Sequence, residues 1–307
     1  MTLTLHIIII IACIVGLWWG AVLIVDSASR IAKKMGMSEL VIGLTIVAIA
    51  TSAPEFAVTV TAAIKGSNEI SVGNIVGSNI FNLGIILGLV ALFRPIRITK
   101  KLIHRDGFLL LVTGFLLVIF FYDGNLSKLE GVILLTMLLV YLIILFLSKE
   151  PIDEDLPEGK FKKYDPLLLI IGAIIIITSA KFFVQSAEEV ALRFGLSKWF
   201  IGITIVAAGT SAPELATSIV AMVKKKYEIS AGNLIGSDLF NMLGVLGIAA
   251  IFKPLQLSQV EYAGLTLLPI TLLITLIFLR TGWKLTRLEG SMLIAIALFR
   301  WFFELIV

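Results

Sequence analysis

One apolar segment occurs twice in this chain, and each copy ends in a glutamate that directly follows a proline. The first copy reads GLTIVAIATSAPE and ends at Glu55, and the second reads GITIVAAGTSAPE and ends at Glu214. A carboxylate within an apolar run is costly in a bilayer, so such residues face the interior of a helix bundle and mark ion or substrate pathways. The pair therefore predicts a polar site inside a membrane, built from both halves of the chain.

The composition of the chain fits a membrane protein and excludes soluble domains. Hydrophobic residues make up 59% of the 307 residues, charged residues make up 15%, and the mean hydropathy is +1.05. We therefore predict a polytopic protein in contact with the lipid bilayer. The net charge of +4 fits a bias in the loops and gives no reason to expect nucleic acid as a partner.

Apolar runs predict about ten transmembrane helices, because crossing roughly 30 Å of hydrocarbon takes about 20 residues. The first run lacks the basic start and the small-residue cleavage site of a signal peptide, so we interpret it as a retained span. The predicted spans are residues 5–25, 40–64, 70–93, 106–122, 129–147, 166–187, 199–223, 229–252, 261–280 and 287–306. The predicted fold class is an all-α polytopic membrane protein.

Residues 148–165 form the only long polar segment and divide the chain near its middle. We interpret them as a linker between two domains, residues 1–147 and 166–307. Lys and Arg residues concentrate in the loops on one side of the predicted membrane, and the linker lies on that side. The positive-inside rule predicts a cytoplasmic linker and two extracellular termini, in the plasma membrane.

The two halves of the chain match one another at a constant offset. Thr51 matches Thr210, and 210 − 51 = 159. Without a gap, the same offset matches Ser38 with Ser197, Glu55 with Glu214, Glu69 with Glu228, Asn74 with Asn233, Ser78 with Ser237, Asn82 with Asn241 and Pro95 with Pro254. This register indicates an internal duplication. Because each half holds about five spans, an odd number, the second copy enters the membrane from the opposite side. The prediction is two inverted-topology five-helix repeats, as in secondary transporters.

The proline in each copy explains how the backbone contributes to the predicted site. Thr51, Glu55 and Thr59 lie four residues apart and share one helical face. Pro54 has no N–H to donate to the carbonyl of Ala50, and its ring predicts a kink at that point. Broken backbone at membrane depth is tolerated where it lines a polar cavity. The second copy repeats the pattern with Thr210, Ser211, Pro213, Glu214 and Ser218.

Two further polar stripes accompany the glutamates, and together they favour a hard cation. Asn74, Ser78 and Asn82 form one stripe, and Asn233, Ser237 and Asn241 form the other. Hydrogen bonds between helices are the alternative role, especially for Asn74 and Asn233. With one cysteine and two histidines in the chain, only oxygen ligands are available, which suits Ca²⁺ or Na⁺. One Ca²⁺ would neutralise the two glutamates.

The motifs resemble those of a known family. Each Thr-Ser-Ala-Pro-Glu is followed by Gly-Asn-x-x-Gly-Ser-(Asn/Asp)-x-Phe-Asn, and this combination is similar to the α-repeats of the sodium/calcium exchangers in the calcium/cation antiporter superfamily. The resemblance covers nearly the whole chain. It implies electrogenic exchange of several Na⁺ for one Ca²⁺ by alternating access, with the first and sixth spans sliding as a gate.

The resemblance also implies ion ligands, which would be transported ions and not cofactors. Glu55 and Glu214 would bind Ca²⁺ together with the carbonyls of Thr51 and Thr210. The flanking Na⁺ sites would use Ser52, Ser78, Ser211, Ser237 and the carbonyls of Ala48 and Ala207, and Asn82 and Asn241 would line the middle. No enzyme activity is implied, and a single protomer would suffice.

Two features leave the coupling ion open. Relatives often carry an aspartate where this chain has Asn241, and its absence leaves two central carboxylates and weakens the case for K⁺ co-transport. Asp238, next to Ser237, lies about 100° from the Ser237–Asn241 stripe on an α-helix, so we interpret it as a pairing residue, a gate residue or a ligand. Proton-coupled calcium exchange is the alternative function. An intramembrane acid–base enzyme is a remote one, because the surroundings of the glutamates are hydroxyls.

Overall fold

The computed structural model describes residues 2–147, 161–195 and 207–306, and these residues are mostly helical, as predicted. The predicted linker, residues 148–165, lies largely outside the described residues, and so does the start of the predicted span 199–223. Helix α9 begins at Asp165, so the last residue that we assigned to the linker belongs to a helix.

The first half begins with a long helix and continues with two interrupted ones. Its elements are α1 (Leu3–Met35), α2 (Glu39–Ile42), η1 (Gly43–Val47), α3 (Ala48–Thr51), α4 (Ala53–Lys65), α5 (Asn68–Ile80), η2 (Phe81–Ile86), α6 (Leu87–Phe93), β1 (Ile96–Arg97), η3 (Leu102–Gly107), α7 (Phe108–Phe120), η4 (Phe121–Asp123), β2 (Asn125–Leu126) and α8 (Lys128–Leu147).

The described part of the second half follows the same order, except that no π-helical turn corresponds to η3. Its elements are α9 (Asp165–Arg193), α11 (Ala207–Thr210), α12 (Ala212–Val223), α13 (Tyr227–Leu239), η6 (Phe240–Val245), α14 (Leu246–Phe252), β3 (Leu255–Gln256), α15 (Gln259–Arg280), η7 (Thr281–Trp283), β4 (Lys284–Leu285) and α16 (Arg287–Ile306). Shifting η2 by 159 residues gives η6, so the duplication in the sequence extends to the π-helical turns.

Among the described residues, seven helices are long and apolar enough to cross a membrane, and the bent pair Glu39–Thr51 and Ala53–Lys65 makes an eighth. The protein is therefore a multi-pass membrane protein. These eight correspond to predicted spans. Of the remaining two, the span 199–223 is described only in part, and the span 287–306 is the charged helix α16, which does not meet the same criteria. Ten spans remain a prediction.

Two pairs of very short strands connect the halves, and the all-α prediction missed them. Strand β1 pairs with β4, and β2 pairs with β3, both antiparallel. The offset of 159 relates β1 to β3 and β2 to β4. Strand β1 therefore pairs with the repeat mate of β2, and β2 pairs with the repeat mate of β1. This crossed pairing is expected if a twofold axis relates the two halves.

Glycines allow the two halves to make backbone contact. A Cβ atom at Gly131 would lie 2.8 Å from the carbonyl oxygen of Gly247, and one at Gly290 would lie 2.8 Å from that of Gly88. These pairs are again related by the offset, since 88 + 159 = 247 and 131 + 159 = 290. Small residues at such crossings let membrane helices pack closely, so α8 contacts α14 in the same way that α16 contacts α6.

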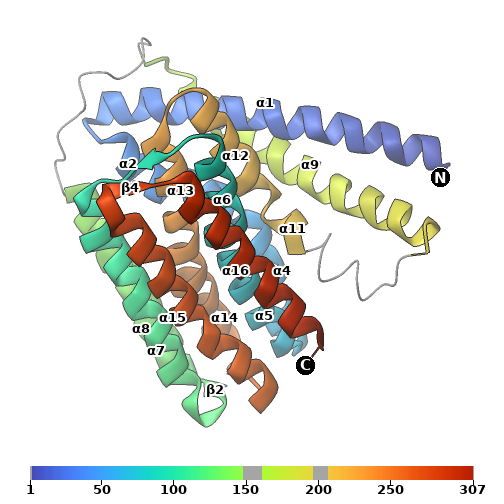
Figure 1. The fold of residues 1–307 in the computed structure, drawn as a ribbon, viewed down its shortest axis with the longest axis vertical. Coiled ribbons are helices and arrows are strands. Elements are labelled where there is room, and N and C mark those ends of the chain that lie inside the picture. Colours follow the sequence, from blue (N-terminus) through green and yellow to red (C-terminus); the bar gives the residue numbers. More distant parts are fainter. Residues whose placement is uncertain (1, 148–160, 196–206, 307) are drawn as a thin grey trace.

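Helices α1 and α9 lie side by side, and together they cross the remaining helices at a steep angle (Figure 1). A Cβ atom at Gly20 would lie 2.9 Å from the carbonyl oxygen of Gly172, so the two backbones are in contact. At one end of the pair, the guanidinium of Arg30 lies 2.7 Å from the buried carboxylate of Asp165. We call these two helices the α1–α9 pair; its members share many contacts and an ion pair, as one rigid unit would.

Candidate functional site

Each Thr-Ser-Ala-Pro-Glu motif lies at a break in a helix. The bend between the helices that end at Thr51 and begin at Ala53 is 51°, which confirms the predicted kink. Ser52 has φ −79° and ψ 11°, and Ser211 has φ −88° and ψ 10°, so the backbone leaves α-helical geometry at the same point in both copies. Each glutamate consequently lies in the first turn of a new helix, where the helix dipole favours an anion.

The two motifs meet inside the protein, and each serine hydrogen-bonds to the glutamate of the other motif. The hydroxyl of Ser52 donates to Oε1 of Glu214 at 3.1 Å, and the hydroxyl of Ser211 donates to Oε1 of Glu55 at 3.3 Å. All four side chains have no exposed surface. The structure thus brings both predicted glutamates together with their flanking serines.

Each glutamate keeps one free acceptor. Within the described part of the chain, Oε2 of Glu55 and Oε2 of Glu214 have no hydrogen-bond partner. The bonds to Oε1 come from serine hydroxyls, which leave the charge of a carboxylate uncompensated. Burying an unpaired carboxylate is strongly unfavourable unless it binds a cation or a proton. The arrangement therefore has the chemistry of a cation site.

The remaining predicted residues of the first motif join this network. Thr51 is fully buried, and its hydroxyl donates to Oδ1 of Asn233 at 3.1 Å and lies 3.3 Å from that of Ser237. The hydroxyl of Ser237 lies 3.3 Å from Oε1 of Glu214 and 3.5 Å from the carbonyl oxygen of Ala48. Ser237 therefore links the carbonyl of one motif to the carboxylate of the other.

The two halves differ at the other predicted residues. Ser78, the mate of Ser237, donates to the carbonyl of Ile75 in its own helix at 3.2 Å. Thr210 is partly exposed on the short helix α11, and the description begins with the backbone of Ala207. Asn74 donates to the hydroxyl of Thr59 at 3.0 Å, which is the interhelical role that we gave as its alternative.

Asn82, Asn241, Asn79 and Asp238 form a fully buried group beside the glutamates. The amide of Asn82 donates to Oδ1 of Asp238 at 2.9 Å, and the amide of Asn241 donates to Oδ1 of Asn79 at 3.3 Å. The sequence reasoning missed Asn79. The signal that could have found it is its position in the repeat, since 79 + 159 = 238.

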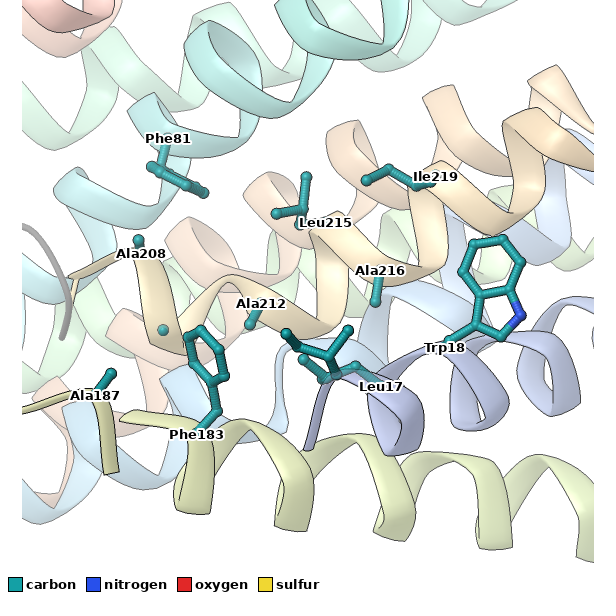
Figure 2. A pocket seen from close by; sticks show the side chains of 12 residues that line it. Leu17, Trp18, Phe81, Phe183, Ala187, Ala208, Ala212, Leu215, Ala216 and Ile219 are labelled. Carbon is teal, nitrogen blue, oxygen red and sulfur yellow. The ribbon is translucent and has the colours of Figure 1, made fainter. Parts of the chain in front are cut away.

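An apolar cavity of about 660 Å³ adjoins the site between the α1–α9 pair and α12 (Figure 2). Leu17 and Trp18 of α1, Phe183 of α9 and Leu215 of α12 line it, together with Phe81, the neighbour of Asn82. The side chains that line it in the described part of the chain are all apolar. The cavity leaves space between the α1–α9 pair and the helix that contains Glu214.

Charged residues that follow α12 connect the α1–α9 pair to the rest of the protein. Lys224, at the end of α12, lies 2.6 Å from the carboxylate of Asp26 in α1. The amine of Lys226 donates to the hydroxyl of Ser29 at 2.5 Å, and that hydroxyl donates to Glu39 at 2.7 Å. Burial lowers the pKa of the Lys226 amine, while the charge of Glu39 acts in the opposite direction.

Comparison with known proteins identifies the family. The model of the sodium/calcium exchanger protein family matches residues 5–147 and 164–304. The chain belongs to the sodium/calcium exchanger family. This confirms the resemblance that the motifs carried, and the family is one of exchangers.

Individual members of the family match nearly the whole chain. The putative antiporter CaxA of Alkalimonas amylolytica is 35% identical over 301 residues, covering 94% of both chains. The sodium/calcium exchanger MaX1 of Methanosarcina acetivorans is 33% identical and covers 95% of this chain and 96% of its own. A solved structure of the sodium-calcium exchanger NCX_Mj superposes with a TM-score of 0.85 at 30% identity, covering 97% of this chain and 98% of that one.

Proposed function

We propose that this protein exchanges Na⁺ for Ca²⁺ across the membrane by alternating access. The observation that supports this most is the pair of fully buried glutamates, Glu55 and Glu214, each with one unpartnered oxygen. One Ca²⁺ between them would neutralise both charges, and Na⁺ ions would do the same in the other half of the cycle. A carboxylate pair that is stable only when loaded favours obligatory exchange over leakage.

Ca²⁺ would lie between the two glutamates, because it takes roughly 6–8 oxygen ligands and both carboxylates and carbonyls are at hand. The carbonyls of Thr51 and Thr210 would complete its shell. The Na⁺ ligands in this proposal are the hydroxyls of Ser52, Ser211, Ser78 and Ser237, the carbonyls of Ala48 and Ala207, and the amides of Asn82 and Asn241. The shared network of Ser52, Ser237 and Glu214 supports mutual exclusion, since one set of oxygens would serve both ions.

The α1–α9 pair is our candidate for the moving part. Its two helices are repeat mates, and they contact each other through Gly20 and Gly172. The cavity beside α12 would give this pair room to shift as a unit, and its charged contacts at Lys224 and Lys226 would form and break during the shift. Sliding of the pair would open the glutamates first to one side and then to the other, as in transporters with inverted repeats.

In this proposal the two five-helix repeats are inverted relative to each other. The crossed pairing of β1 with β4 and of β2 with β3 supports this arrangement. The protein would function as a single protomer in the plasma membrane, with its termini outside and its linker in the cytoplasm.

Purified protein in Na⁺-loaded proteoliposomes tests this function. We expect ⁴⁵Ca²⁺ uptake that requires an outward Na⁺ gradient and that is lost in Glu55→Gln and Glu214→Gln, which keep the volume of the side chains. Uptake driven equally well by a pH gradient without Na⁺ would favour proton-coupled exchange instead. Uptake that survives both substitutions would refute the assignment of the glutamates.

A further inference from the structure

Basic residues gather where η3 and α7 begin and α15 ends, on the side of the protein that we predict to be cytoplasmic. Strand β1 pairs with β4 at this point, and Arg97 lies directly opposite Lys284. Like charges in directly opposite positions of a strand pair are destabilising. Within the described residues, neither side chain has a hydrogen bond or an ion pair. The two cations together therefore attract an anion.

The repeat shows that the fold does not require these charges. The offset of 159 relates β1–β4 to the strand pair β2–β3, in which the two facing residues are Asn125 and Gln256. The same strand pair thus forms with neutral side chains. Two further cations nearby are also absent from the other copy. In order, Arg97, Lys100, Arg280 and Lys284 correspond to Gln256, Gln259, Phe121 and Asn125.

Trp283 is another feature of this copy alone. Its mate is Gly124, since 124 + 159 = 283, and both have a left-handed backbone, with φ of 54° and 78°. This conformation is unfavourable for a bulky side chain and suits glycine. The indole ring lies edge to face with the ring of His104, with centroids 5.5 Å apart, and Nζ of Lys100 lies 5.5 Å from the indole centroid. Trp283 therefore links Lys100 to His104, and tryptophan is enriched at the level of lipid headgroups.

An apolar groove of about 230 Å³ runs from this cluster between α7 and α15. Phe108 and Ile277 line it and are 62% and 53% exposed, so the groove opens to the outside of the helix bundle, where lipid lies. Leu273 lines its deeper part. His104 and Arg280 line the end near the strands. Arg280 lies seven residues from Leu273, about 10 Å along the helix.

The end of the groove is basic and has no acidic side chain in its described lining. Arg280 has no hydrogen bond or ion pair from its side chain within the described residues. Asp106, the acidic residue of η3, is fully buried and accepts hydrogen bonds from Arg105 at 2.7 Å and from Tyr141 at 2.9 Å. It is therefore occupied elsewhere. A guanidinium fits phosphate oxygens in a bidentate manner, and basic pockets between membrane helices bind anionic headgroups.

We propose that one anionic phospholipid binds at this place, with an acyl chain in the groove between α7 and α15 and its phosphate at Arg280 and His104. Lys100 and the facing cations Arg97 and Lys284 supply further positive charge beside the headgroup. Because α7 belongs to the first half and α15 to the second, the lipid stabilises the contact between the halves. The proposal concerns a surface away from the glutamate pair and does not depend on the exchange function.

Native mass spectrometry of the purified protein, titrated with phosphatidylglycerol or with phosphatidylcholine of the same acyl chains, tests the proposal. We expect one phosphatidylglycerol to bind about tenfold more tightly than phosphatidylcholine. Arg280→Gln with Lys100→Gln should abolish this preference. The matched control, Lys33→Gln with Lys34→Gln, removes two charges from α1 on the same predicted side and should keep it. Equal affinity of the wild type for both lipids, or an equal loss in both double variants, would overturn the proposal.

Two further measurements separate the groove from the charges and the lipid from a soluble anion. Ile277→Trp fills the groove and keeps every cation, and it should weaken the binding of phosphatidylglycerol; unchanged binding would overturn the placement of the acyl chain, even if the double variant at Arg280 and Lys100 does not fold. Phosphatidylglycerol should raise the melting temperature of the wild type, whereas glycerol phosphate, which has no acyl chain, should not. An equal rise with glycerol phosphate would overturn the lipid in favour of a soluble anion.

Discussion

The ion pair between Lys224 and Asp26 gives the sharpest prediction about the movement of the α1–α9 pair. The two groups lie 2.6 Å apart and join the end of α12 to α1. If α1 shifts relative to α12 during the cycle, this contact forms in one access state and breaks in the other. The contact lies on the side of the protein that is predicted to be cytoplasmic. Replacing Asp26 with asparagine should therefore favour the access state in which that side is open.

The magnitude follows from the exposure of the two side chains, which is 31% for Lys224 and 32% for Asp26. Partly exposed ion pairs contribute about 0.2–1 kcal/mol. Since 1.36 kcal/mol corresponds to a factor of ten, the equilibrium between the states should shift by up to about fivefold. The apparent affinity at one face scales with the population of the state open to that face. Ca²⁺ affinity at the cytoplasmic face should rise by the same factor.

The assay is Na⁺-driven ⁴⁵Ca²⁺ flux in vesicles of known orientation, with the Ca²⁺ dependence measured separately at each face. The charge exchange Asp26→Lys with Lys224→Asp is the matched control and should return the affinity to that of the wild type. Equal effects of Asp26→Asn at both faces, or no recovery in the exchanged variant, would refute a state-dependent contact.

Further predictions concern the serines of the site and the helix crossings. Ser52→Ala and Ser211→Ala each remove one hydroxyl bonded to the opposite glutamate. A hydrogen bond to a charged group is worth about 1.5–3 kcal/mol, so each variant should need at least a tenfold higher Na⁺ concentration for half-maximal ⁴⁵Ca²⁺ uptake. Ser27→Ala, whose hydroxyl bonds to its own helix, should behave as the wild type, and equal effects of all three would contradict the assignment. Gly131→Val places a branched side chain against the carbonyl of Gly247 and should cost about 1–3 kcal/mol, lowering the melting temperature in detergent. Gly73→Ala, which has open space around it, should leave the melting temperature nearly unchanged, and an equal decrease in both would contradict the close crossing.

The sequence was sufficient to predict the repeat, the kink and the two glutamates, because each leaves a local signal. Pro54 and Glu55 are adjacent, so their consequences follow from the covalent chain and from the cost of a charge in an apolar run. The crossed bonds from Ser52 to Glu214 and from Ser211 to Glu55 leave no such signal. They depend on how the two halves pack, which one sequence does not specify.

Asp238 is a residue whose role the sequence left open. A regular α-helix places it about 100° from Ser237, and both residues lie within α13. Asp238 accepts a hydrogen bond from Asn82 of the other half, which is the pairing role among the alternatives that we gave. Which residue of the other half it meets depends on how the halves pack, and helical periodicity does not report that. The two-residue strands were missed because they are too short to show alternation.

The most direct test of coupled exchange follows both ions in the same vesicles, with ²²Na⁺ inside and ⁴⁵Ca²⁺ outside. We predict that Ca²⁺ entry and Na⁺ exit rise and fall together, at a constant ratio across all gradients, and that both fluxes disappear in Glu214→Gln. Ca²⁺ entry that proceeds without any Na⁺ exit would contradict the claim that the two ions take turns at Glu55 and Glu214.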